Sequence, residues 1–114
     1  MTDFYNITNS SNEGNKYIFT TIINAQHPVF QGHFPNNPIV PGVMSLMMVR
    51  ECVESIIKRK THFSYIKEIK YIQAIVPDGN ELTISVELDG NTIAGEVANS
   101  QGANLLKLKA TLAD

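Results

Sequence analysis

The 114-residue chain has 43% hydrophobic and 18% charged residues, a balance that excludes an intrinsically disordered protein and is typical of one soluble globular domain. Its formal net charge of −2 lacks the basic excess of nucleic-acid-binding proteins, so nucleic acid is not expected as a partner. The single cysteine, Cys52, cannot form an intrachain disulfide, and no Cys/His spacing is typical of a zinc site.

The first 14 residues are polar and rich in Asn, Ser and Thr, and they predict a loose lead-in to the domain. They contain neither the basic start nor the apolar core of a signal peptide. The longest apolar-rich stretch, residues 39–49, is interrupted by a proline, a glycine and a serine and is too short to span a membrane. We therefore expect a cytoplasmic protein that folds as a single domain over residues 1–114.

Three elements are predicted for the first half of the chain. Residues 16–25 are rich in β-branched and aromatic side chains, which favours a strand. Residues 27–41 contain four prolines, which exclude a helix interior or a central strand and indicate an irregular loop with a largely fixed path. Residues 43–60 lack glycine and proline and directly follow Pro41-Gly42, so they predict a helix.

The first two turns of the predicted helix, residues 43–49, are apolar on all sides apart from one serine. Such a pattern indicates a helix that is buried all round, and in so small a chain the covering structure would be a curved sheet. Residues after the helix predict strands at 63–75, 82–88, 92–97 and 105–112, separated by turns. One strand, one helix and an antiparallel meander give an α+β fold.

The loop and helix start carry a resemblance to a known family. Residues 32–35 read Gly-His-Phe-Pro, followed after two residues by Pro-Ile and after one more by Pro-Gly-Val, ending at Val43. This spacing closely resembles the active-site signature of the beta-hydroxyacyl-ACP dehydratases of fatty acid synthesis. A weaker likeness lies at residues 75–79, Ile-Val-Pro-Asp-Gly. The resemblance implies a hotdog fold, in which a long central helix is wrapped by a curved antiparallel sheet.

The resemblance also implies an active site. His33 would act as the base that removes the proton alpha to the thioester carbonyl, since an imidazole titrates near neutral pH. The backbone N–H of Gly42, at the positive end of the helix dipole, would stabilise the oxygen that becomes negative. No metal or redox cofactor is implied. The residues implied to contact the acyl substrate are Phe34, Pro35, Val43, Met44 and Met47.

One position departs from the family pattern. The family has a carboxylate fourteen residues after the histidine, and here that position is Met47, which can neither donate nor accept a proton. Glu51, one helical turn further on, is the candidate substitute. The alternatives are that Glu51 is a solvent-facing or ion-paired carboxylate, with Arg50 as a possible partner. Met44, Met47 and Met48 are most simply explained as core residues packed against the sheet, with a lining for an acyl chain as the alternative.

Three functions remain open from the sequence. The leading one is an (R)-3-hydroxyacyl-thioester dehydratase; the resemblance implies a homodimer in which each site is shared between a histidine loop and the other chain's helix. The second is a catalytically impaired acyl-thioester-binding subunit that pairs with an active paralogue, and the third is a hotdog thioesterase. The expected carrier partner is acyl carrier protein. The basic run at residues 58–60 is either a solvated helix end or, together with Lys67 and Lys70, a candidate docking surface for that acidic carrier.

Overall fold

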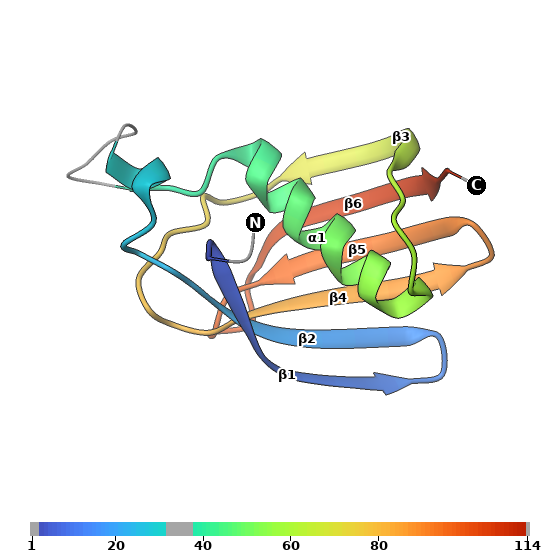
Figure 1. Ribbon diagram of the computed structural model, residues 1–114, viewed down its shortest axis with the longest axis horizontal. Coiled ribbons are helices and arrows are strands. Elements are labelled where there is room, and N and C mark those ends of the chain that lie inside the picture. The colour runs from blue at the N-terminus through green and yellow to red at the C-terminus, as the bar shows by residue number, and fades with distance from the viewer. Residues whose placement is uncertain (1–2, 32–37, 114) are drawn as a thin grey trace.

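The computed structural model describes residues 3–31 and 38–113 as a six-stranded antiparallel sheet with one long helix lying across its face (Figure 1). The strand order is β1-β2-β4-β5-β6-β3, so β1 and β3 form the two edges. The elements in chain order are β1 (Tyr5–Glu13), β2 (Lys16–Ile23), the 3-10 turn η1 (Pro28–Gln31), α1 (Gly42–Ile57), β3 (Phe63–Tyr71), β4 (Leu82–Asp89), β5 (Thr92–Ala98) and β6 (Asn104–Leu112).

The core forms between α1 and the sheet face that it crosses. Alternate residues of β4 are buried, and so are alternate residues of β5, as expected for strands with one face covered. The helix approaches β5 so closely that a Cβ on Gly95 would lie 3.1 Å from Cγ1 of Val49. A larger residue would require Val49 to shift by a few tenths of an ångström, so packing favours glycine at this position. The side chains with almost no exposure include Met48, Val49, Val53, Ile84, Leu106 and Leu108.

The predicted loose lead-in is wrong for most of its length, because residues 5–13 form strand β1. This strand pairs with β2 through a two-residue loop in which Gly14 has a φ of 61°, and Glu13 lies opposite Lys16. After Tyr5, every residue of β1 is exposed. An edge strand that buries almost no side chain is held by main-chain hydrogen bonds, and its sequence therefore shows no apolar alternation.

The prediction that α1 is buried on every side is also wrong for a single protomer. The sheet covers one face of the helix, while Val43 is 67% exposed and Leu46 and Met47 are half-buried. The physical reason is geometric: a six-stranded sheet curls against one side of a helix and leaves the opposite side uncovered (Figure 1). An apolar stripe of α1 is thus left facing away from the sheet.

Two element boundaries differ from expectation by a few residues. The helix ends at Ile57 because Lys58 adopts a left-handed conformation, with a φ of 60°, and donates its backbone N–H to Glu54 O at 2.8 Å. Strand β3 ends at Tyr71, after which the N–H groups of Ile72 and Gln73 both donate to Leu105 O. None of the helices in the described part of the chain has the length and apolarity needed to cross a membrane.

Candidate functional site

The start of α1 is fixed by main-chain hydrogen bonds on both sides of Pro41. The N–H of Val40 donates to Ile75 O at 2.7 Å, which ties the chain before the helix to the segment after β3. The carbonyl of Pro41 accepts from the N–H groups of Met44 and Ser45 at 3.0 and 3.2 Å. The N–H groups of Gly42 and Val43 precede these first helical donors, so they lie at the positive end of the helix dipole without an acceptor inside the helix.

Gly42 lines a cavity of about 420 Å³, which we call the β3–α1 cavity. Tyr71, at the end of β3, covers the glycine, and a Cβ on Gly42 would lie 3.0 Å from the Tyr71 hydroxyl. The other walls are mostly apolar and come from residues 39–40, 72–75 and 105–106, together with Ser45. The cavity therefore combines backbone donors with an apolar lining, the combination that a ligand with one polar group and a hydrocarbon tail requires.

The predicted base and two of the predicted substrate contacts, His33, Phe34 and Pro35, lie outside the described residues. Their roles stay predictions. The segment that precedes them is well anchored, since Phe30 of η1 is buried and its ring stacks on Phe4 with a centroid separation of 5.8 Å. His27 lies edge-on to the same Phe4 ring at 5.2 Å and accepts a hydrogen bond from the N–H of Val29.

The remaining predicted substrate contacts lie on two faces of α1. Met44 is 8% exposed and packs in the core between helix and sheet, so its main contribution is to packing. Val43 and Met47, four positions apart, lie on the uncovered stripe of the helix. Met47, at the position of the family carboxylate, thus faces away from the sheet of its own protomer.

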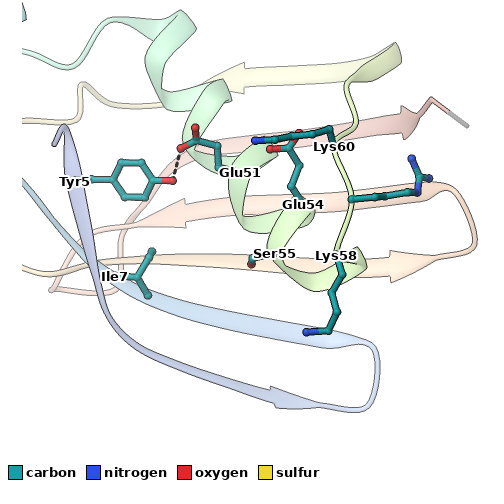
Figure 2. Close-up of a pocket in the computed structure, with 8 residues that line it drawn as sticks. Tyr5, Ile7, Glu51, Glu54, Ser55, Lys58 and Lys60 are labelled. Atoms are coloured by element: carbon teal, nitrogen blue, oxygen red, sulfur yellow. Dashed lines mark hydrogen bonds between the residues drawn. The ribbon is translucent and has the colours of Figure 1, made fainter. Parts of the chain in front are cut away.

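Glu51 lies in a second cavity, of about 600 Å³, between β1 and the second half of α1 (Figure 2). We call it the β1–α1 cavity. The hydroxyl of Tyr5 donates a hydrogen bond to Glu51 Oε1 at 2.6 Å. Burial, with the hydrogen bond to Glu51 and the charge of that carboxylate, raises the pKa of Tyr5 well above its ordinary value near 10. The other lining residues are Ile7, Glu54, Ser55 and the basic run at residues 58–60.

One protomer does not bring Gly42 and Glu51 together. Glu51 follows Gly42 by nine positions, which in an α-helix corresponds to about 13 Å along the axis and to opposite sides of the helix. The two residues accordingly line two separate cavities. An active site that uses both kinds of group would have to take them from two chains.

The partner of Glu51 was not foreseen from the sequence. Arg50 does not pair with it, since Arg50 Nε is buried and has no hydrogen-bond partner among the described residues. The partner is Tyr5, which sits in the segment predicted to be a loose lead-in. The available signal was the pair Phe4-Tyr5, two large aromatic residues inside an otherwise polar stretch.

Comparison with known proteins gives a consistent picture. The model of the ApeI-like family, described as ApeI dehydratase, matches residues 9–106. The 3-hydroxyacyl-acyl-carrier-protein dehydratase FabZ of Pelotomaculum thermopropionicum is 30% identical over 101 residues, covering 82% of this chain and 70% of that protein. The bifunctional enzyme LpxC/FabZ of Bacteroides thetaiotaomicron is 36% identical over 74 residues, covering 58% of this chain but only 16% of that longer protein.

Among solved structures, the dehydratase heterocomplex ApeI:P from Xenorhabdus doucetiae superposes with a TM-score of 0.81 at 20% identity. The match covers 95% of this chain and 96% of that chain. At this identity the likeness shows the fold, and the expected α+β hotdog fold is confirmed.

Proposed function

Since the chain belongs to the ApeI-like dehydratase family, we propose that it eliminates water from (R)-3-hydroxyacyl thioesters to give trans-2-enoyl thioesters. The observation that carries the proposal is the position of Gly42, the first residue of α1, in the wall of the mostly apolar β3–α1 cavity. His33 lies nine positions before Gly42 in the chain, at the spacing of the family signature. The dehydratase relatives reported above support the same reaction.

One base is enough to move the proton in the proposed reaction. His33 takes the proton from C2 of the acyl chain, while the helix N-terminus at Gly42 stabilises the negative charge that develops on the thioester oxygen. The C3–O bond then breaks, and the imidazolium of His33 returns the same proton to the departing hydroxyl, which leaves as water. A carboxylate that accepts a hydrogen bond from the 3-hydroxyl would orient this group, and we assign that task to Glu51.

The assignment of Glu51 requires a second subunit, because Gly42 and Glu51 lie on opposite sides of one helix. A homodimer supplies it, with His33 and Gly42 from one copy and Glu51 from the other. Two edges of the sheet are open among the described strands, β3 beside Gly42 and β1 beside Glu51, so the contact must bring the β1 side of one copy to the β3 side of the other. Large apolar residues are exposed on or beside β3, at Tyr65, Ile66, Tyr71 and Ile72.

The proposal is tested with the purified protein and a 3-hydroxybutyryl or crotonyl thioester. We expect native protein to interconvert the two, His33→Ala to lower kcat by about 10²–10⁴-fold, and Glu51→Gln to lower it within the same range. His62→Ala is the matched control, because His62 is an exposed histidine outside both cavities. Unchanged turnover in His33→Ala would overturn the dehydratase assignment.

A second candidate is favoured by one observation, the methionine at the position of the family carboxylate. In this version the chain is one half of a heteromer, and a paralogous subunit supplies the carboxylate to the site that contains His33 and Gly42. The likeness to a dehydratase heterocomplex supports it. Because Met47 lies half-buried on the uncovered stripe of α1, Met47→Glu should then give the isolated protein turnover that Met47→Gln does not give. Full activity of the isolated native protein would contradict the heteromer.

We further propose that the acyl chain arrives on acyl carrier protein. Lys58, Arg59 and Lys60 are all exposed, directly follow α1 and line the β1–α1 cavity. Figure 2 shows Lys58 and Lys60 at this end of the helix. A cluster of cations of this kind would attract an acidic carrier, and the attraction would weaken with salt.

A further inference from the structure

The start of β1 is held in place from several directions. Phe4 is fully buried and its ring contacts both His27 and Phe30. Its carbonyl accepts the N–H of Asn24 at 2.8 Å, and Asn24 Nδ2 donates to Asp3 O at the same distance. Asp3 also lies 3.5 Å from Nε2 of His27. The backbone next to Tyr5 is therefore fixed, and so is the direction in which the Tyr5 side chain leaves it.

In the hydrogen bond between Tyr5 and Glu51, Tyr5 must be the donor. A carboxylate can only accept, so the phenol O–H is the donor, and the 2.6 Å separation is that of a short charge-assisted bond. The raised pKa of Tyr5 means that the phenol keeps its proton throughout the neutral range. Tyr5 is thus a permanent donor to Glu51.

This hydrogen bond leaves the two carboxylate oxygens of Glu51 in different environments. Oε1 is occupied by Tyr5, whereas Oε2 has no hydrogen-bond partner among residues 3–31 and 38–113. The carboxylate is half-buried and stands on the wall of the β1–α1 cavity, which is large enough for part of an acyl chain. Oε2 is consequently the oxygen that a ligand in this cavity can reach.

Building on the function proposed above, we propose that Tyr5 is a positioning residue that holds Glu51 with Oε2 turned to the substrate's 3-hydroxyl. The β1–α1 cavity is then the place where the hydroxyl-bearing part of the acyl chain meets this subunit. Tyr5 gives up no proton in the reaction, so the proton balance between C2, His33 and the leaving water is unchanged. The Tyr5–Glu51 pair takes the place of the carboxylate that the family has at the position of Met47.

The experiment removes only the phenol oxygen, with Tyr5→Phe in the full-length protein. We expect kcat to fall about tenfold while KM stays within about twofold, since the ring and the cavity shape are retained. In a Glu51→Gln background, Tyr5→Phe should have no further effect, because the two residues act as one unit. Tyr17→Phe is the matched control, a half-buried tyrosine on β2 outside the β1–α1 cavity, and its kcat should equal that of the native protein.

The outcomes separate this inference from the function on which it rests. Native kcat in Tyr5→Phe, with Glu51→Gln impaired, would overturn the inference alone. So would equal losses from Tyr5→Phe in the native and Glu51→Gln backgrounds, since additive effects indicate a purely structural role. A thermal unfolding curve for each variant identifies any loss of folded protein. No turnover in the native protein would overturn both the function and the inference.

Discussion

The hydroxyl of Tyr71 lies 3.0 Å from the point where a Cβ on Gly42 would stand. The contact joins the last residue of β3 to the first residue of α1, so the two residues are separated in sequence by the whole helix and the whole strand. Gly42 does not have a positive φ, so the close approach of Tyr71, and not backbone conformation, is what favours glycine here. Tyr71 covers the helix N-terminus, and a ligand reaches it when this exposed side chain moves aside.

Gly42→Ala should therefore affect function more than stability. Tyr71 is 56% exposed and can move aside, so we expect a stability loss below about 1 kcal/mol. The added methyl group would stand in front of the backbone donors, and kcat/KM should fall about 10- to 100-fold. Kinetics and thermal unfolding of the same sample check this. A large drop in Tm with unchanged kcat/KM would contradict the assigned role.

Gly95→Ala is the matched glycine variant and should lower stability while leaving activity unchanged. The new Cβ would meet Cγ1 of Val49 at 3.1 Å, and Val49 is fully buried, so the surrounding core must shift to make room. We expect a loss of about 1–3 kcal/mol in the free energy of unfolding, the usual cost of overpacking a core. Denaturant titration measures it, while kcat of the folded protein should be retained. A stability equal to that of native protein would contradict the tight contact between α1 and β5.

Phe4→Ala should release the start of β1. The side chain is fully buried between His27 and Phe30, and truncation of a buried phenylalanine costs about 3–5 kcal/mol. Hydrogen exchange should then accelerate in residues 5–13 more than in β4 or β5. Ile7→Ala is the control on the same strand, because Ile7 is 39% exposed and should cost much less. Equal exchange rates in native and Phe4→Ala protein would contradict this anchoring.

The buried thiol of Cys52 should make stability fall in alkaline solution. Burial, with a smaller contribution from the charge of Glu51, raises the pKa of Cys52 from about 9 to about 12. Between these values the unfolded chain has lost the thiol proton and the folded chain has kept it. The stabilising contribution is therefore complete below pH 9 and declines as pH rises towards 12, by up to about 1.4 kcal/mol per pH unit.

Cys52→Ala isolates this effect. The variant should be less stable at every pH because it leaves a small cavity, but its stability should decline less steeply above pH 9 than that of the native protein. Urea unfolding at a series of pH values gives the two slopes. Identical slopes would show that the thiol does not titrate differently in the folded and unfolded states.

The basic run at the end of α1 should affect carrier-bound substrates more than free ones. Reversing the charge of Lys58, Arg59 and Lys60 together should raise KM for an acyl-carrier substrate, with the difference shrinking as salt increases. KM for a short thioester without the carrier should change less, because only the lining of the β1–α1 cavity is then altered. Lys109→Glu serves as the control, since Lys109 is exposed on β6, outside the β1–α1 cavity. Equal effects on both substrates would contradict carrier docking at this run.

The sequence predicted the strands in which apolar residues mark the side that is buried. Strands β2, β4, β5 and β6 each contribute side chains to the core, so they show β-branched or alternating patterns. Strand β1 was missed because its exposed residues are mostly Asn, Ser and Thr, whereas β3, the other edge strand, was predicted from its β-branched and aromatic residues. The apolar stripe of α1 was recognised, but the sequence could not tell burial against the sheet from an uncovered surface.

The site was predictable where it follows a local motif and was not where it depends on tertiary contacts. The helix start at Gly42 follows from Pro41 and the residues after it. The Tyr5–Glu51 pair joins residues 46 positions apart, which no local pattern reports. Arg50 was the sequence's candidate partner for Glu51, yet adjacent residues of a helix point in different directions, about 100° apart.

The most direct test of the dehydratase proposal is mass spectrometry of native protein incubated with an (R)-3-hydroxybutyryl thioester. We predict that the substrate loses one molecule of water while the thioester bond stays intact, and that the reaction runs backwards from the crotonyl thioester. Release of free thiol together with 3-hydroxybutyrate would contradict the proposal, because that product pair identifies a thioesterase.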